Sequence, residues 1–203
     1  MSYLENEIPD EDVIIKDLDK GEFGSKLLFL GLAQTGKTSI IQVVFENKAP
    51  ETTSEIHATV GVRRKLVDFS DISLNVYDVG GQITYLEEAF VDLRESIFSR
   101  IKALFFVVDS SKHDDFETAK MYFRRAIGNL NEYSPEGKTV VLAHKMDLIP
   151  KEVRAKAVST ISEIFELEDY SEVKIFETSI FEDSLLKTIE ETLMDAGAKA
   201  PGI

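Results

Sequence analysis

The sequence predicts an α/β domain with a mostly parallel six-stranded sheet, one antiparallel strand and helices on both faces of the sheet. Apolar runs of strand length alternate with helical patterns from Lys26 onward. The run Ala103–Val108 is uniformly apolar, as a strand buried on both faces must be. A glycine-containing loop follows the first apolar run, where sheets of this class bind ligands.

The elements follow in chain order. The expected strands are 26–30, 62–69, 72–77, 103–108, 139–143 and 173–177. Only Ser70-Asp71 separates the second strand from the third, so these two should pair antiparallel, whereas the longer connections predict parallel pairing. The expected helices are 38–46, 85–99, 115–132, 151–165 and 183–195. On the third helix, Phe116, Met121, Tyr122 and Phe123 could form a partner face, but helical aromatic spacing favours core packing.

Composition limits the possible functions. The chain has 203 residues, a net charge of −14 and no cysteine. An acidic surface disfavours nucleic acid and anionic lipid as partners. The absence of cysteine excludes disulfides, zinc thiolate sites and thiol-linked lipids, and Ser2 stands where myristoylation requires glycine. We therefore expect a cytoplasmic protein with no direct lipid anchor, which would reach a membrane only through partners.

Three regions are expected. Residues 1–25 are an acidic N-terminal extension, either a partly disordered tail or a segment with a short helix around Asp12–Leu18. Residues 26–195 form the folded domain, and residues 196–203 a flexible C-terminal tail.

The segment from Gly31 to Thr38 has the spacing G-x-x-x-x-G-K-[ST] of a phosphate-binding loop. It lies between an apolar strand and a helix, the context that the motif requires, and this disfavours an ordinary glycine turn. Backbone N–H groups and the helix dipole attract phosphate there. Lys37 would supply charge to the outer phosphates, and the hydroxyl of Thr38 would ligate Mg²⁺.

A second segment, Tyr77-Asp-Val-Gly-Gly-Gln82, follows at the end of the third strand. Asp78 would hold Mg²⁺ through its water shell. Gly80 and Gly81 allow the backbone to approach a terminal phosphate, and the amide of Gln82 could orient an attacking water. Thr59, just before the second strand, would ligate the same Mg²⁺ and touch the γ-phosphate.

Two later segments point to guanine. His144-Lys-Met-Asp147 is similar to the guanine-reading motif [NT]-K-x-D. Asp147 would accept hydrogen bonds from the ring N–H and the exocyclic amine, a pair that adenine does not present. The stem of Lys145 could lie across the base. The alternative for Asp147 is a helix N-cap before Pro150. Backbone groups in Glu177–Ile180 could contact the guanine carbonyl.

Together these segments resemble the small Ras-like GTPases over residues 26–195. Asp78-Val-Gly-Gly-Gln82 and Ala58-Thr-Val-Gly61 are similar to Arf-type proteins, and His144-Lys-Met-Asp147 with Leu148 is similar to the Rag/Gtr branch, which we favour. Rag proteins carry a second, roadblock-type domain and Arf proteins a myristoylated N-terminal helix, and neither is expected here. A stand-alone form of mixed character fits an archaeal relative or an early-branching form.

The resemblance implies the G-domain form of the P-loop NTPase fold, with GTP or GDP and Mg²⁺ as ligands. It implies catalytic roles for Lys37, Thr59 and Gln82 and metal ligation by Thr38, Thr59 and, through water, Asp78. The implied nucleotide contacts are Gln34, Thr35, Gly36, Lys37, Thr38, Ser39, Thr59, Gly81, His144, Lys145, Asp147, Ser179 and Ile180.

The resemblance also implies activating, exchange and effector proteins as partners, with a separate roadblock- or longin-type subunit as a further candidate. Ala33 stands where family members often have glycine, which would narrow the space for a partner's arginine finger. Arg63 and Arg64 fit the second strand better than an internal catalytic role.

Three functions fit these residues. The leading hypothesis is a slow GTP-hydrolysing switch that a partner stimulates. The second is an adaptor module that binds GTP or GDP without useful hydrolysis, which the presence of Lys37, Thr38, Thr59, Asp78 and Gln82 disfavours. The third is an ATPase or small-molecule kinase, which Asp147 disfavours.

Overall fold

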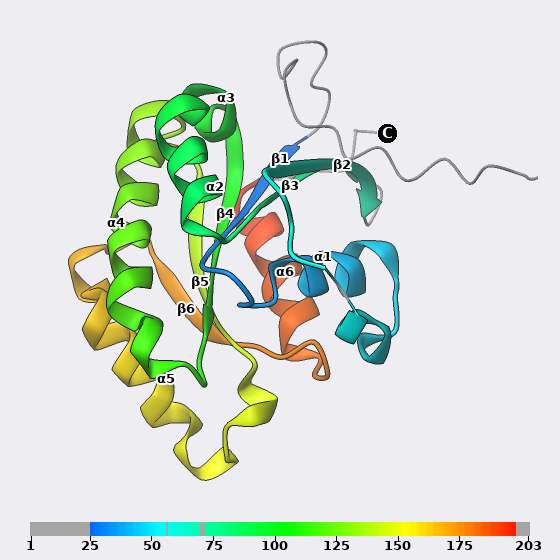
Figure 1. Ribbon diagram of the computed structural model, residues 1–203, viewed down its shortest axis with the longest axis vertical. Coiled ribbons are helices and arrows are strands. Elements are labelled where there is room, and N and C mark those ends of the chain that lie inside the picture. The colour runs from blue at the N-terminus through cyan, green and yellow to red at the C-terminus, as the bar shows by residue number, and fades with distance from the viewer. Residues whose placement is uncertain (1–24, 56, 70–71, 198–203) are drawn as a thin grey trace, which may run out of the picture.

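Six strands form one sheet in the order β2-β3-β1-β4-β5-β6 in a computed structural model, which describes residues 25–55, 57–69 and 72–197. All neighbouring strands are parallel except β2 and β3, which pair antiparallel from Val62↔Val79 to Phe69↔Ile72. The predicted mixed sheet is therefore confirmed (Figure 1). The strands are β1 (Ser25–Leu30), β2 (Val62–Phe69), β3 (Ile72–Val79), β4 (Ile101–Asp109), β5 (Lys138–His144) and β6 (Lys174–Glu177).

Some predictions fall outside the described residues. These are the acidic extension before Ser25 with its short helix around Asp12–Leu18, the Ser70-Asp71 turn and the tail after Gly197. Within the described residues, no helix is long and apolar enough to cross a membrane.

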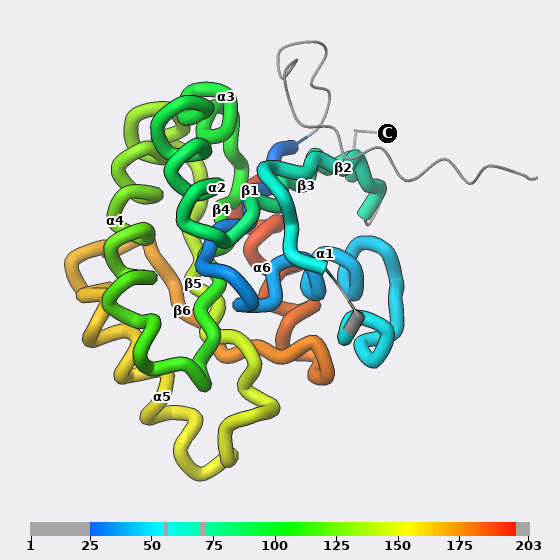
Figure 2. Tube along the Cα trace, viewed as in Figure 1, coloured from blue at the N-terminus to red at the C-terminus, as the bar shows by residue number. Residues whose placement is uncertain are grey.

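Helices cover both faces of the sheet. In Figures 1 and 2, α4 (Phe116–Tyr133) and α5 (Lys151–Phe165) lie on one face, and α1 (Lys37–Glu46) and α6 (Ser184–Asp195) on the other. Each face of the sheet carries a hydrophobic core, and alternate residues of β4 pack into one or the other. Phe106 lies in the core on the α4–α5 face and Phe105 in the core on the α1–α6 face. Both faces of this strand are buried, which explains its uninterrupted apolar sequence. Short 3₁₀ turns lie in the connections between helices and strands, at Pro50–Glu55, His113–Asp115, Met146–Leu148 and Leu167–Asp169.

The predicted single helix 85–99 is wrong. The chain instead forms α2 (Ile83–Glu87), a π-helical turn η2 (Glu88–Asp92) and α3 (Arg94–Phe98), with a break at Leu93. In a continuous α-helix, residues eight apart point about 80° away from each other. The wider turn and the break allow Phe90 and Phe98 to meet in one core, with ring centroids 5.4 Å apart.

Hydrogen bonds and a cation–π contact join the segment that contains α2 to α4. Glu87 accepts hydrogen bonds from Tyr122 at 2.8 Å and from Nη2 of Arg125 at 3.0 Å. The guanidinium of Arg125 lies over the ring of Phe90, 5.0 Å from its centroid. Phe116, Tyr122 and Phe123 are buried, as their spacing predicted, whereas Met121 is exposed. The position of α2 therefore depends on α4 as well as on the sheet.

Candidate functional site

The loop after β1 turns sharply into α1. Gly36, the residue before α1, has φ 102°, and a Cβ there would lie 2.8 Å from the ring of His144. Only glycine suits both the left-handed backbone and the close packing. No side chain caps the N-terminus of α1, so its N–H groups and the positive end of its dipole remain available for an anion.

Lys37 is buried at the start of α1. Its Nζ donates hydrogen bonds to the carbonyls of Gly31 and Leu32, each at 2.8 Å. Burial lowers the pKa of Lys37 to about 8, with the charge of Asp78 acting in the opposite direction. The loop therefore folds around the ammonium group.

Three side chains converge beside this loop. Oδ2 of Asp78 accepts hydrogen bonds from the hydroxyls of Thr38 at 2.6 Å and Thr59 at 3.1 Å, and the two hydroxyls are 2.9 Å apart. Burial raises the pKa of Asp78, although the charge of Lys37 and the two hydroxyls favour the ionised form. Residues 19 to 40 positions apart in the sequence thus meet at one point.

This cluster fits Mg²⁺. Oδ1 of Asp78 is buried and has no hydrogen-bond partner among the described residues, so one carboxylate oxygen remains for a ligand. The donors are one carboxylate and two hydroxyls, whereas no group of three or more His, Cys, Asp or Glu that could hold a metal occurs in the described part of the chain. Mg²⁺ suits such a sparse oxygen set because it also binds waters and substrate phosphates.

The residues that follow β3 contact both the loop that carries Thr59 and the phosphate loop. The N–H of Gly80 donates to the carbonyl of Gly61 at 2.7 Å, which joins β3 to the loop that carries Thr59. A Cβ on Gly81 would lie 2.4 Å from the backbone nitrogen of Ala33, so Gly81 lies directly against the phosphate loop. Gln82 follows as the residue before α2 and is exposed.

The segments after β5 and β6 are also joined. His144, the last residue of β5, lies with Nδ1 3.0 Å from Oγ1 of Thr178. Burial, and next the charge of Lys145, lower the pKa of His144 to about 4. Asp147 is exposed, and its Oδ1 accepts a hydrogen bond from Ser179 at 2.6 Å.

The alternative role for Asp147, capping of the following helix, is wrong. Pro150 precedes α5, and no side chain caps that helix. Ile180 is half-buried and packs against the core on the α1–α6 face. Arg64 bonds to Asn75 within the β2–β3 pair through Nη2 at 2.7 Å, as a strand residue and not beside the phosphate loop.

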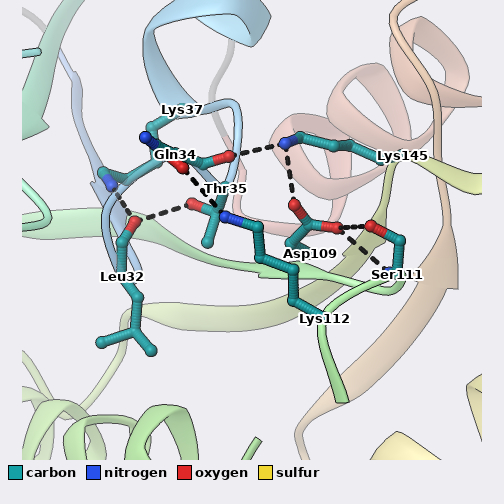
Figure 3. Close-up of polar contacts among 8 residues, drawn as sticks. All are labelled: Leu32, Gln34, Thr35, Lys37, Asp109, Ser111, Lys112 and Lys145. Atoms are coloured by element: carbon teal, nitrogen blue, oxygen red, sulfur yellow. Dashed lines mark hydrogen bonds and ion pairs between the residues drawn. The ribbon is translucent and has the colours of Figure 1, made fainter. Parts of the chain in front are cut away.

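Asp109, which the sequence analysis missed, lies at the end of β4 directly beside His144 of β5. It is buried, and Figure 3 shows it pointing toward Lys145, whose Nζ lies 2.8 Å from Oδ2. The sequence could have indicated Asp109, because an acidic residue ends an apolar strand at the same sheet edge as Asp78. It belongs to none of the motifs that identified the other residues.

A pocket of about 410 Å³ opens over the phosphate loop. Most of the predicted residues line it. The exceptions are Thr35, Asp78 and His144, which are buried, and Asp147, Ser179 and Ile180. Residues of the loop before Thr59, among them His57, contribute walls that the sequence analysis did not identify. The lining residues are Ala33, Gln34, Gly36, Lys37, Thr38, Ser39, Thr53, Ser54, His57, Ala58, Thr59, Gly81, Gln82 and Lys145.

Comparisons with known proteins agree with this geometry. The model of the Gtr1/RagA G protein conserved region matches residues 26–192. The GTP-binding protein GTR1 of Saccharomyces cerevisiae is 30% identical over 167 residues, which cover 80% of this chain and 54% of that protein. The Ras-related GTP-binding protein A of Dictyostelium discoideum is 30% identical over 164 residues, with the same coverage of 80% and 54%.

The chain spans about half the length of these relatives. Among solved structures, the Arl6 BBS3 small GTPase of Trypanosoma brucei, with the bound nucleotide analogue GppNp, shares the fold with a TM-score of 0.68. The two chains are 23% identical, and the match covers 85% of this chain and 97% of that one.

Proposed function

The chain belongs to the Gtr1/RagA family of G proteins, and on that premise we propose that it is a small GTPase that switches between GTP- and GDP-bound states. The observation that carries the proposal is the convergence of Thr38, Thr59 and Asp78 beside Lys37. Thr59 lies in the loop before β2, and its hydroxyl is within hydrogen-bond distance of Thr38 and Asp78. A ligand at this point would therefore control the position of that loop.

In the proposed complex, backbone groups from Gln34 to Ser39, including Thr35 and Gly36, surround the phosphates at the N-terminus of α1. The ammonium of Lys37 turns from the loop carbonyls to the β- and γ-phosphates. Thr38 and Thr59 would ligate Mg²⁺ directly and Asp78 through water. Held by these residues, Mg²⁺ would supply positive charge to the phosphates.

Guanine is selected at the next part of the sheet edge. Asp147 accepts hydrogen bonds from the ring N–H and the exocyclic amine, while the stem of Lys145 lies along the base. Ser179 already orients Asp147 through a bond of 2.6 Å. Ile180 and Ser179 offer backbone N–H groups to the guanine carbonyl, and His144 supports the phosphate loop from below.

Hydrolysis follows in line. Gln82 orients a water whose oxygen attacks the γ-phosphorus, and the bond from that phosphorus to the bridging oxygen of GDP breaks. The attacking oxygen keeps one hydrogen as a hydroxyl on the phosphorus, the second proton passes to a γ-phosphate oxygen, and GDP and inorganic phosphate leave. The N–H of Gly81 and the ammonium of Lys37 stabilise the charge on the γ-phosphate oxygens.

The switch itself comprises residues 48–61 and 80–95, which order with GTP and relax with GDP. No arginine of the described chain lines the pocket, so intrinsic hydrolysis is slow and an activating protein accelerates it. Ala33 lines the pocket and limits the approach of such a protein. Exchange factors, effectors and a separate roadblock- or longin-type subunit complete the proposed cycle, in the cytoplasm or at a membrane reached through these partners.

Single-turnover hydrolysis of GTP with Mg²⁺ tests the proposal. Gln82→Leu should lower the rate by roughly 10²-fold, the lower end of what a positioned polar group contributes to such a step. Gln42→Leu is the matched control, because Gln42 lies on α1 and does not line the pocket. If GTP binds but the wild type hydrolyses it no faster than Gln82→Leu, the chain is an adaptor module that binds nucleotide without using its energy.

A further inference from the structure

Lys145 bridges two segments of the site. Its Nζ donates to the backbone carbonyl of Gln34 at 2.6 Å and to Oδ2 of Asp109 at 2.8 Å, as Figure 3 shows. Gln34 belongs to the phosphate loop, whereas Lys145 belongs to the segment 144–147 that follows β5. The ammonium group thus connects the two parts of the site that would bind the two ends of a nucleotide.

Asp109 is built to hold this ammonium in place. Its side chain is 3% exposed, and its second oxygen, Oδ1, accepts hydrogen bonds from the backbone N–H of Ser111 at 3.0 Å and from the Ser111 hydroxyl at 2.6 Å. Burial would raise the pKa of Asp109, but the bonds from Lys145 and Ser111 outweigh burial and leave that pKa below its ordinary value. The carboxylate is therefore charged and fixed at neutral pH.

The backbone on both sides of the bridge needs such support. Gln34 has φ 63° and Lys145 has φ 60°, left-handed conformations that residues with a side chain rarely adopt. Both residues lie in loops at the pocket rim, where packing alone restrains the chain less than in the core. The side chain of Gln34 is also held, because its Oε1 accepts a hydrogen bond from Lys112 at 2.9 Å.

We propose that Asp109 is a positioning residue for nucleotide binding, which holds Lys145 on the carbonyl of Gln34 and so joins the phosphate loop to the base-reading segment before nucleotide arrives. The inference rests on the proposed guanine-nucleotide function. A preformed site loses less conformational freedom on binding and therefore releases its ligand more slowly. Because Asp109 acts through Lys145 and Gln34, and not on the γ-phosphate, it should affect GDP and GTP equally.

Release of a fluorescent GDP analogue and of its GTP counterpart tests the inference. Asp109→Asn keeps the size of the side chain and removes its charge, so both dissociation rates should rise by at least about tenfold. Ser111→Ala removes only one hydroxyl bond to Asp109 and should raise both rates by a smaller factor, about two- to threefold. The matched control is Asp195→Asn at the end of α6, which removes one charge of an exposed ion pair with Lys174 of β6.

A double-mutant cycle separates positioning from simple structural support. If Asp109 acts through Lys145, the double variant Asp109→Asn with Lys145→Ala should release GDP no faster than Lys145→Ala alone. Nucleotide-free Asp109→Asn should still unfold in one transition well above the assay temperature, so that the folded protein and not an unfolded fraction releases the nucleotide. Additive effects on release, or a fall in melting temperature that accounts for the faster release, would assign Asp109 a structural role only.

The outcomes distinguish the two proposals. If the wild type binds GDP and both Asp109→Asn and Ser111→Ala release it at the wild-type rate, the inference about Asp109 is wrong while the proposed function stands. If the wild type binds no guanine nucleotide, the proposed function fails, and the inference fails with it.

Discussion

A methyl group at Gly81 has no room in this fold. Its Cβ would lie 2.3 Å from the carbonyl carbon of Leu32 and 2.4 Å from the backbone nitrogen of Ala33. Carbon atoms pack at roughly 3.5–4.0 Å, so Gly81→Ala must separate the two backbones by more than about 1 Å. Lys37 and Lys145 hold the phosphate loop, so the segment that begins at Gly81 should move instead.

This displacement should have a large effect on hydrolysis, because Gln82 follows directly. A shift of about 1 Å at a reacting centre can cost roughly 10²-fold in rate. We expect single-turnover hydrolysis of GTP by Gly81→Ala to fall by about that factor. GDP should still bind, because the N–H of Gly81 is proposed to meet the γ-phosphate, which GDP lacks.

A matched substitution makes the assay selective. Gly128 lies on α4, and a Cβ there meets nothing within 4 Å, so Gly128→Ala should leave hydrolysis unchanged and should stabilise the helix by up to about 1 kcal/mol. If Gly81→Ala hydrolyses GTP within about threefold of the Gly128→Ala rate, which is far less than the loss expected from a 1 Å shift, the close approach of Gly81 to the loop has no catalytic role.

Three further predictions concern charge and base selection. Because the folded-state pKa of His144 is about 4 and its ordinary value is 6.5, the unfolded chain takes up a proton first as the pH falls, and stability should drop by up to roughly 3 kcal/mol between these values. Denaturant unfolding across this range should show a smaller drop in His144→Asn, and an equal drop would exclude His144 as the cause. Burial raises the pKa of Asp78 in the folded state above its ordinary value of 3.8. The free energy of unfolding should therefore fall as the pH rises from 3.8 toward the raised pKa, because the unfolded chain ionises first. Asp78→Asn should raise the melting temperature of the nucleotide-free protein at pH 7 and weaken Mg²⁺-dependent binding of GTP, whereas a lower melting temperature would contradict this account. Asp147→Asn should lower the affinity for GDP by at least about 10²-fold and favour xanthosine diphosphate, whose base has a carbonyl in place of the amine. Equal preference before and after the substitution, measured by competition, would place the base elsewhere.

Local signals in the sequence predicted most of the fold. The run Ala103–Val108 has the length and the uniformly apolar sequence of a strand buried on both faces. The two-residue connection before Ile72 favoured an antiparallel pair. The phosphate loop was recognisable because its glycines and Lys37 follow from local backbone geometry. The segment 85–99 was misjudged because its π-helical turn satisfies tertiary contacts between Phe90 and Phe98, which periodicity does not encode.

The site shows the same division between local and distant causes. Lys37, Thr38 and Asp78 belong to short motifs, and the structure brings them together with Thr59. Asp109 was missed because its importance depends on Lys145, 36 residues away, and on the register between β4 and β5. Likewise, Ser179 was expected to act through its backbone, and its hydroxyl contact with Asp147 joins loops 32 residues apart.

The central claim is that the site formed by the phosphate loop and the segments after β5 and β6 selects guanine nucleotides. Equilibrium competition between GDP and ADP, with Mg²⁺ and a fluorescent GDP analogue as the probe, tests it most directly. Asp147 and Ser179 should make ADP a weaker competitor than GDP by at least about 10³-fold, because adenine lacks the donors that the carboxylate accepts. Displacement of the analogue by ADP at the same concentrations as GDP would contradict the account.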